Sequence, residues 1–596
     1  MPICGTTTRT SVWRAAALLA MLAFGVRLLA LYQTSSVPTA RHLIGDAAGY
    51  YTWARSVAAG NWIGTEAFYQ APLYPYVLAV WFTIVGDSLL MVRVLQAAWG
   101  AGACALLCVA ATRMFERRVG ILAGVLLALY GPAVFFDGIV QKASLDNLLI
   151  CAMLALATSG GRRLSAGRCV GLGAVVSLLA LTRENAIVWH FIWPAWIALG
   201  ETGWVRPTCE NGRRGESRGA RPGAVGELRG RAGGIAGYAL GAVAILMPVG
   251  LRNAYVGGEF SVTTFQAGPN FYIGNHRGAD GRYQPLVRGH ETPAFERRDA
   301  TMVAQKATGR TMTPREVSRY WLQQAWLDIK ADPRRWLRLM GYKAMLTTNR
   351  YEVSDAESCR VYGDASRLLS FLGGVGHFGV VVPLAVLGAA ATWPRRRKLW
   401  AQYALAISMG GAVTVFYVLA RYRYPLVPIL MPFAAAGCVH AWDSLRSWRL
   451  AALRMPTALA IAAGLVVNWP IQDERRLDAL AEMNAGVALA ESGELKNATA
   501  LFRGALEINP QSAEANNNLA QALALQGGFA EAVGYYRAAL AMEPNLPGVH
   551  YNFGVAFEQM GRTAEAAEQY ALAVGQDPGD DEARAAIKRL ADRPGQ

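Results

Sequence analysis

Charged residues are scarce in this sequence. Only 17% of the 596 residues are Asp, Glu, Lys or Arg, whereas 53% are hydrophobic and the mean hydropathy is +0.21. A soluble multidomain protein needs more surface charge, and this chain has several apolar runs long enough to cross a bilayer. The composition therefore predicts a polytopic membrane protein.

Paired cysteines and metal-type spacings are also missing. The eight cysteines are scattered, most of them in apolar runs, and none forms a CxxC pair or joins a histidine at metal-ligand spacing. This excludes a disulfide framework and a zinc site. His276 and His290 share a loop without a local carboxylate cluster, so we predict no metal-binding residues. Whether a divalent cation, Mg²⁺ or Mn²⁺, assists as a cofactor is left open.

The net charge of +16 follows from arginines in short loops between the apolar runs. This is the distribution that positive-inside topology demands, and it differs from the single basic face of a nucleic-acid-binding protein. We therefore predict no nucleic-acid partner.

Eleven apolar runs are candidates for membrane spans. They lie near residues 13–32, 88–112, 119–136, 145–159, 168–182, 186–200, 235–251, 368–393, 399–419, 425–442 and 454–470. The run 72–86 is shorter and contains Pro72 and Pro75, so it suits a re-entrant or interfacial helix better than a full span.

The basic clusters decide the topology. With the N-terminus in the cytoplasm and 72–86 left out of the count, every strong cluster falls on the inner side. The outer loops are then 33–87, 137–144 and 252–367, and everything after the last span is outside. For a bacterial inner membrane, the C-terminal region is periplasmic.

From about residue 479 the hydrophobic runs give way to a 34-residue period. Gly493, Gly527 and Gly561 recur at one phase, and the aromatic residues Phe502, Tyr536 and Tyr570 at another; Pro510, Pro544 and Pro578 recur at a third, and Ala498, Ala532 and Ala566 at a fourth. The pattern resembles tetratricopeptide repeats, whose concave surface binds a peptide or protein. We divide the chain into a transmembrane domain, 1–472, and a domain of three repeats, 473–596.

Asp46 lies shortly after the first span and is the second residue of the stretch "GDAAGYYTWARSVAAG". On position alone it suits the N-cap of an amphipathic helix that carries Tyr50, Tyr51 and Trp53. A second outer loop, "FFDGIVQKASLDN", offers further polar groups at the membrane surface, namely Asp137, Lys142 and Asp146. Together the two loops favour a site.

These stretches, with "QAPLYPYVLA" at 70–79 and "ARYRYPLVPILMPFAA" at 420–435, resemble the GT-C glycosyltransferases. The similar branch is that of bacterial protein O-mannosyltransferases and aminoarabinose lipid A transferases. The resemblance spans roughly the first 470 residues and implies an all-α transmembrane fold. It also implies transfer of a sugar from a polyprenyl-phosphate donor to a protein or envelope glycolipid or glycan acceptor outside the cytoplasm.

By the same match, Asp46 is the catalytic base or orienter of the acceptor. The second acid is Asp137 or Asp146, and we favour Asp146 because it starts a span. Tyr50, Gln70 and Tyr74 are predicted to contact the acceptor or the sugar.

A leaving phosphate needs cations. Arg421 and Arg423 in "RYRYP" and Lys142 are the candidates, although Arg and Tyr at a span end also serve as interfacial anchors. Arg183 and Glu184 are expected to form an ion pair that closes a hairpin turn.

Two other functions compete with the transferase. One is a membrane scaffold without enzymatic activity that presents the repeats to a protein partner, and the other is a polysaccharide ligase or flippase. Acids at the ends of about eleven spans favour an enzyme over an anchor. A ligase would place its main groups in a late outer loop, whereas the best constellation here is early.

The span count makes a direct prediction about the repeats. A reporter enzyme fused to the C-terminus is expected to be active in the periplasm, because an odd number of spans follows a cytoplasmic N-terminus. Activity of the fused reporter in the cytoplasm would overturn the topology.

Overall fold

The computed structural model describes residues 7–159, 164–199, 224–287, 293–471, 473–577 and 579–592. Within these ranges every regular element is a helix, which confirms the all-α class. His290 and most of the Arg-rich loop 206–231 lie outside the described residues.

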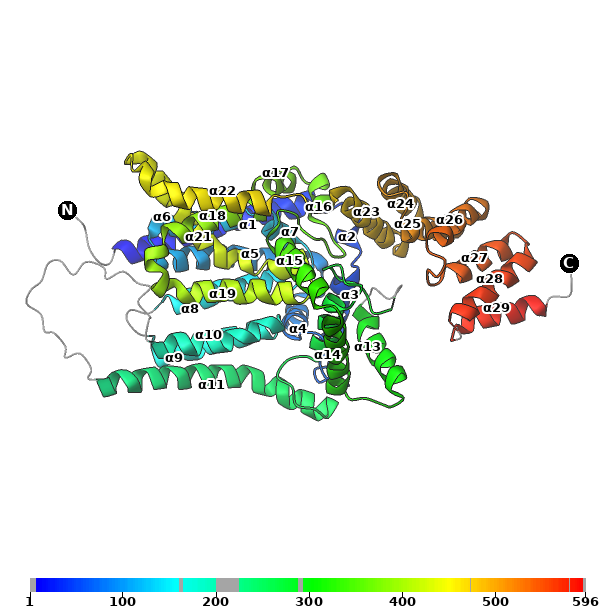
Figure 1. Ribbon diagram of the computed structural model, residues 1–596, viewed down its shortest axis with the longest axis horizontal. Helices are drawn as coiled ribbons and strands as arrows, with labels where there is room; N and C mark the ends of the chain where they lie inside the picture. The colour runs from blue at the N-terminus through cyan, green and yellow to red at the C-terminus, as the bar shows by residue number, and fades with distance from the viewer. Residues whose placement is uncertain are drawn as a thin grey trace, which may run out of the picture.

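Helices of the apolar region run side by side as one bundle (Figure 1). They are α1 (Thr7–Gln33), α5 (Leu89–Met114), α6 (Arg117–Ala128), α7 (Gly131–Gly138), α8 (Ala143–Ala157), α9 (Ala166–Ala180), α10 (Trp189–Leu199), α11 (Ala224–Gly257), α17 (Arg367–Val375), α18 (Phe378–Ala391), α19 (Arg396–Val415), α21 (Leu426–Arg446) and α22 (Arg454–Val467). Short 3-10 helices precede α10, α19 and α22 at η1 (Glu184–Val188), η2 (Trp393–Arg395) and η3 (Leu450–Leu453).

The length of these helices refines the span prediction. Among the described residues, six helices are long and apolar enough to cross a membrane, or seven if the α6–α7 pair, bent by 54°, is one span. The other four predicted spans are also helical, but α8, α9 and α10 have only 15, 15 and 11 residues, and α19 begins with two arginines and a lysine. The chain is a multi-pass membrane protein.

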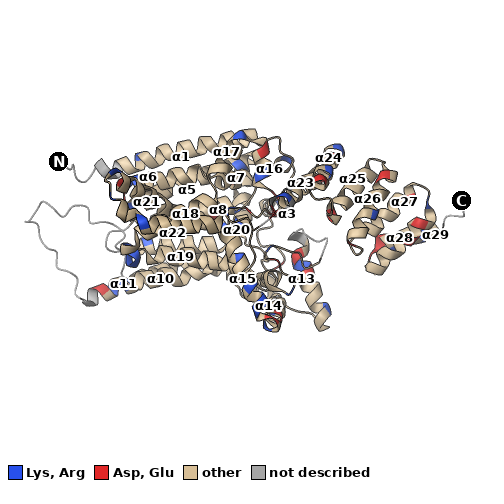
Figure 2. Ribbon diagram, turned by 45° about the horizontal axis from the view of Figure 1, so that its top comes forward, with Lys and Arg blue, Asp and Glu red and all other residues tan. Residues whose placement is uncertain are grey.

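The two ends of the bundle differ in charge. Lys and Arg gather at the end where α1 begins (Figure 2). There Arg118 at the start of α6 pairs with Asp443 near the end of α21 at 2.6 Å, and Arg395 donates to the carbonyl of Met114 at 2.7 Å. This clustering agrees with the single basic side that the sequence predicts.

The opposite end carries the shorter helices of the predicted outer segments (Figure 1). They are α2 (Pro38–Arg41), α3 (Gly45–Ala58), α4 (Leu73–Val85), α12 (Ala267–Asn275), α13 (Pro293–Thr308), α14 (Pro314–Ala331), α15 (Pro333–Thr348), α16 (Cys359–Ala365) and α20 (Ala420–Arg423). The run 72–86 corresponds to α4, which has 13 residues and begins directly after Pro72.

Beyond this end the chain continues as an array of helical pairs (Figure 1). The helices are α23 (Glu474–Glu491), α24 (Leu495–Ile508), α25 (Ala513–Leu525), α26 (Phe529–Met542), α27 (Val549–Gln559), α28 (Thr563–Gln576) and α29 (Asp581–Ala591). The periodic aromatics Phe502, Tyr536 and Tyr570 are all buried between pairs. Gly493, Gly527 and Gly561 have φ between +75° and +84°, a turn conformation that favours glycine.

A buried ion pair joins two helices of the bundle and lies against a third. Arg27 in α1 donates from Nε to Asp137 Oδ2 in α7 at 2.6 Å, and both side chains are excluded from solvent. Gly100 in α5 faces this pair, and a Cβ at that position would overlap both partners. Asp137 was predicted as a catalytic acid of an outer loop, but it lies inside the bundle. A buried carboxylate needs a cation beside it, and Arg27 supplies that cation.

The pair makes a prediction about stability. Asp137→Ala is expected to cost about 3–5 kcal/mol because it leaves Arg27 buried without its partner, whereas the double variant Arg27→Leu/Asp137→Leu, which removes both charges, is expected to stay much closer to wild type. The fraction of monodisperse protein in detergent after heating measures the difference. A single variant as stable as wild type would contradict this account.

Candidate active site

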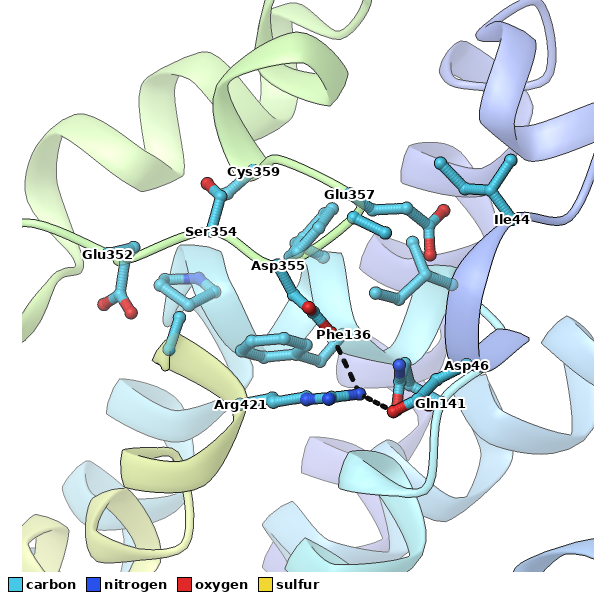
Figure 3. A pocket seen from close by; sticks show the side chains of 15 residues that line it. Ile44, Asp46, Phe136, Gln141, Glu352, Ser354, Asp355, Glu357, Cys359 and Arg421 are labelled. Atoms are coloured by element: carbon cyan, nitrogen blue, oxygen red, sulfur yellow. Dashed lines mark hydrogen bonds and ion pairs between the residues drawn. The ribbon is translucent and has the colours of Figure 1, made fainter. Parts of the chain in front are cut away.

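Arg421 lies between two carboxylates at the outer end of the bundle. Its Nη1 pairs with Asp46 Oδ2 and, at 3.0 Å, with Asp355 Oδ2 (Figure 3). Gln70 donates to the other oxygen of Asp46 at 3.4 Å. The sequence positions 46, 70, 355 and 421 are thus brought together by four different segments of the chain.

Gly45 precedes Asp46 and has a backbone conformation that favours glycine. Its φ is +54°, in the left-handed region, and a Cβ at this position would lie 3.3 Å from Cβ of Ala356, in the loop that carries Asp355. The helix α3 starts there with Ile44 as its N-cap residue and without a capping side chain. Asp46 is therefore not the N-cap residue that its position suggests. Its carboxylate instead accepts hydrogen bonds from Arg421 and Gln70.

Arg423 holds the loop that carries Asp355. It donates to the carbonyls of Leu346, Asn349 and Tyr351 and pairs with Glu352 at 2.9 Å. Arg423 is fully buried and does not line the pocket beside Asp46. It was predicted to bind phosphate, but its contacts are with backbone carbonyls, Glu352 and the ring of Phe378, so the structure gives it a positioning role.

Next to Arg421 is a pocket, which we name the acid pocket. Its polar lining includes four carboxyl groups against the guanidinium of Arg421, and its apolar lining comes mainly from the α7 segment. Its polar residues include Asp46, Gln141, Glu352, Asp355, Glu357 and Arg421. Pro132, Phe135 and Phe136 form the apolar wall.

The pKa values of the two carboxylates beside Arg421 shift in opposite directions. Burial raises the pKa of Asp46, but the charges of Arg421 and Lys142 outweigh burial and hold that pKa below its usual value. Burial raises the pKa of Asp355. Arg421 offsets this only in part and the charge of Asp46 adds to it, so the pKa of Asp355 is raised. Asp46 is thus the stronger acid of the two.

A second and roomier pocket lies on the side of Tyr422; we name it the lysine pocket. It is lined by Lys142, Arg183, Glu184, Thr264, Asn270, Tyr417 and Tyr422, among others. Lys142 is 7% exposed and forms no ion pair with any residue in the described ranges. Burial lowers its pKa, although Glu184 raises it. A buried ammonium without a carboxylate partner suits an anionic ligand.

Asp146 acts on the site through Arg183. Its Oδ2 pairs with Arg183 Nη2 at 2.7 Å, and the same nitrogen donates to the backbone carbonyl of Arg421 at 3.0 Å. Asp146 is fully buried and lines neither pocket. The expected pair between Arg183 and Glu184 does not form, since Glu184 accepts instead from Thr264 and Gln266.

The three residues predicted to contact the acceptor or the sugar differ in their position relative to the site. Gln70 reaches Asp46, as described above. Tyr50 is buried, with Lys142 Nζ 6.0 Å from its ring centre and the ring of Tyr74 at 5.3 Å. Tyr74 donates to Gln96 inside the bundle, so its hydroxyl is already engaged by the protein. Neither tyrosine lines the acid pocket or the lysine pocket.

No group of three or more His, Cys, Asp or Glu side chains in the described part of the chain is arranged to hold a metal ion. The carboxylates of the acid pocket are spread over its walls, and three of them are paired with arginines.

Residues 483–547 and 517–581 each match the family model of the tetratricopeptide repeat. The C-terminal helical pairs are tetratricopeptide repeats. Three of them, α23–α24, α25–α26 and α27–α28, precede the last helix, α29. No curated protein sequence matches the chain.

Solved structures resemble the whole chain distantly. The oligosaccharyltransferase of Archaeoglobus fulgidus, in complex with zinc and sulfate, is 13% identical with a TM-score of 0.41, over 78% of this chain and 54% of that one. Its apo form is 15% identical with a TM-score of 0.40, over 80% and 56%. ArnT from Cupriavidus metallidurans, bound to undecaprenyl phosphate, is 16% identical with a TM-score of 0.36, over 93% and 79%. The chain spans about half the length of the archaeal protein.

Glu357 gives the acid pocket a testable pH dependence. Burial raises its pKa from 4.5 to about 7, and the hydrogen bond from Tyr362 at 2.7 Å and the charge of Arg93 offset this only in part. Between pH 4.5 and 7 the folded protein then binds a proton that the unfolded chain has lost, so Glu357 lowers stability as pH rises through this window.

We expect Glu357→Gln to melt at a higher temperature than wild type at pH 8, with the advantage shrinking toward pH 4.5. Differential scanning fluorimetry across this range measures it. The matched control is Glu507→Gln on an exposed face of α24, whose difference from wild type should not change with pH. A flat difference for Glu357→Gln as well would show that this carboxyl is not perturbed.

Proposed function

We propose that the protein is a membrane glycosyltransferase that moves a sugar from a polyprenyl-phosphate donor to an acceptor on the outer face of the membrane. The observation that carries the proposal is the ionised Asp46, held by Arg421 beside the acid pocket, with the unpaired Lys142 a short distance away. A base for the acceptor and a cation for the leaving phosphate are what displacement of a sugar from phosphate requires. The GT-C-like motifs of the sequence support the same reaction.

The donor phosphate is assigned to the lysine pocket. Lys142 is the cation there that has no carboxylate partner among the described residues, and Arg183 is already neutralised by Asp146. The polar lining of Thr264 and Asn270 offers hydrogen bonds to a sugar, and Tyr417 and Tyr422 offer ring faces. Arg421 contributes through its position between the pockets and not as a free phosphate ligand.

The acceptor is assigned to the acid pocket. Its hydroxyl or amine attacks the anomeric carbon, the bond from that carbon to the phosphate oxygen breaks with its electron pair going to phosphate, and Asp46 takes the acceptor's proton. The charge that develops on the phosphate is stabilised by Lys142.

Asp355 has a supporting role in this scheme. When Asp46 becomes protonated, Arg421 loses one of its two counter-charges while buried in the site. Asp355, 3.0 Å from the same nitrogen, remains beside the guanidinium as its second carboxyl partner. Arg421 is therefore still in contact with a carboxyl group when Asp46 has taken the acceptor's proton.

The first test is transfer of radiolabelled sugar from a polyprenyl-phosphate donor by membranes that contain equal amounts of each variant. We expect Asp46→Asn to lower transfer by about 10²–10⁴-fold, because the amide cannot take the proton. The fraction that becomes labelled, protein or lipid, identifies the acceptor class.

Asp87→Asn is the matched control. Asp87 is an exposed acid at the same end of the bundle, where it pairs with Arg55 at 3.1 Å. It should transfer sugar at the wild-type rate. Equal transfer by wild type and Asp46→Asn would overturn the proposed function.

A further inference from the structure

The side-chain carboxamide of Gln141 lies in the acid pocket without a hydrogen-bond partner. Gln141 is 5% exposed and lines the pocket, and its Oε1 is buried with no donor among the described residues. The backbone at this position is held in place, because its N–H donates to the side chain of Gln96 at 3.3 Å. A buried acceptor left unpaired is costly, so this oxygen points to a ligand that donates to it.

The carboxyl groups around the same pocket have few cations beside them. Among the described residues that line it, Arg421 is the single Lys or Arg, and it is shared by Asp46 and Asp355. Glu357 forms no ion pair with any residue in the described ranges and accepts a hydrogen bond from Tyr362 at 2.7 Å. Within ion-pair distance, three acids of the described chain therefore share one cation. Such a surplus of buried carboxyl groups attracts a positively charged ligand.

The unpaired acceptors face one another across the pocket. The loop between α15 and α16 carries Asp355 and Glu357 on one side, and Gln141 lies on the opposite side together with Arg421 (Figure 3). A ligand group between the two sides would meet Gln141 Oε1 on one side and carboxyl oxygens on the other. The surplus of charge and the unpaired oxygen thus concern the same space.

A primary ammonium group suits this set of acceptors. It supplies a positive charge and three N–H donors, enough for Gln141 Oε1 and for the carboxyl groups of Asp355 and Glu357. The rings of Phe135 and Phe136 in the apolar wall suit the methylene carbons next to the nitrogen, and their faces attract its charge. A metal ion is less suited, since no group of three or more acidic, His or Cys side chains in the described part of the chain is arranged to hold one.

We propose that the acid pocket contains a subsite for a primary ammonium group of the acceptor, formed by Gln141, Asp355 and Glu357. This deepens the proposed function and rests on it for the reaction, because Asp46 then stays available for the hydroxyl that receives the sugar. The preferred acceptor is an amino alcohol, whose ammonium group binds at the subsite while its hydroxyl reaches Asp46. A neutral alcohol leaves the carboxyl groups without a counter-charge and binds more weakly.

Binding is tested without a sugar donor. The probes are 4-amino-1-butanol and 1,4-butanediol, which have the same chain length and differ in one charged group. Each is titrated against the full-length protein in phosphatidylcholine nanodiscs at pH 7.5, and saturation-transfer difference NMR gives the dissociation constant after subtraction of the signal from protein-free nanodiscs. We expect the amino alcohol to bind about tenfold more tightly or better, because its hydrogen bonds are charge-assisted. Equal affinities, or no binding of the amino alcohol, would rule out the subsite.

Gln141→Leu keeps the size of the side chain and removes its acceptor. It should weaken binding of 4-amino-1-butanol by about tenfold. Gln141→Glu restores an acceptor and should bind the amino alcohol at least as tightly as wild type. The matched control is Gln323→Leu, which changes an exposed glutamine of α14 and should leave both affinities unchanged. If Gln141→Leu binds the amino alcohol as wild type does, the proposed subsite is wrong.

Glu357 gives this binding a pH dependence. The charged and titratable groups that face it are Tyr362, Arg93 and Asp355. Burial and the charge of Asp355 raise its pKa from 4.5 to about 7, against the hydrogen bond from Tyr362 and the charge of Arg93. Because an ammonium group favours the ionised carboxylate, binding should tighten by roughly threefold or more between pH 5.5 and pH 8, and less so in Glu357→Gln. An affinity of wild type that does not rise with pH would contradict the role of Glu357.

Transfer assays separate this inference from the proposed function. With a polyprenyl-phosphate donor, wild type should have a kcat/KM about tenfold higher for the amino alcohol than for the diol, and Gln141→Leu should reduce this ratio. If transfer depends on Asp46 but the ratio is one, the subsite fails and the proposed function stands. If Asp46→Asn transfers as well as wild type, the proposed function fails, and the NMR titration still decides whether the pocket binds an ammonium group. The labelled fraction, protein or lipid, then identifies the natural carrier of the amine.

Discussion

A guanidinium shared between two carboxylates is the interaction on which the site depends. Arg421 is 8% exposed, so it needs a counter-charge, and it has two within reach from segments about 310 residues apart. Its backbone is fixed by Arg183, and the loop opposite is fixed by Arg423. Three arginines thus act together, one facing the pocket and two holding the chain around it. The buried charges of Asp146, Arg183, Glu352 and Arg423 thus hold the chain on either side of Arg421.

Features that depend on neighbouring residues could be predicted from the sequence. The 34-residue period predicted the repeats, because each aromatic residue packs against the adjacent pair and each glycine turns the chain within its own repeat. Hydrophobic runs predicted the helices of the bundle because a helix, too, depends on residues that are close in sequence. Span length was less predictable, since α8 and α9 are covered by other helices and do not need the length of an isolated span.

The site was predictable only in part, because ion pairs join residues that are distant in sequence. Asp46, Arg421 and Gln70 do meet, as their positions beside spans suggested. Asp137 and Asp146 have the same sequence character but are paired with Arg27 and Arg183 inside the bundle. Asp355 and Glu357 were missed; the acidic run "YEVSDAES", in a chain with few acids, was the available signal. Nothing in that run indicates that Arg421 is the residue with which Asp355 pairs.

The bond between Arg27 and Asp137 also constrains how the protein is made. Arg27 is synthesised 110 residues before its partner, so α1 leaves the ribosome with a cation that has no counter-charge. An isolated arginine is expensive in hydrocarbon, but Arg27 is close to the outer end of α1 and its long side chain can reach the headgroups. When α7 arrives, the guanidinium has to turn inward to meet Asp137. The first helix therefore settles to its final depth only after a quarter of the chain has been inserted.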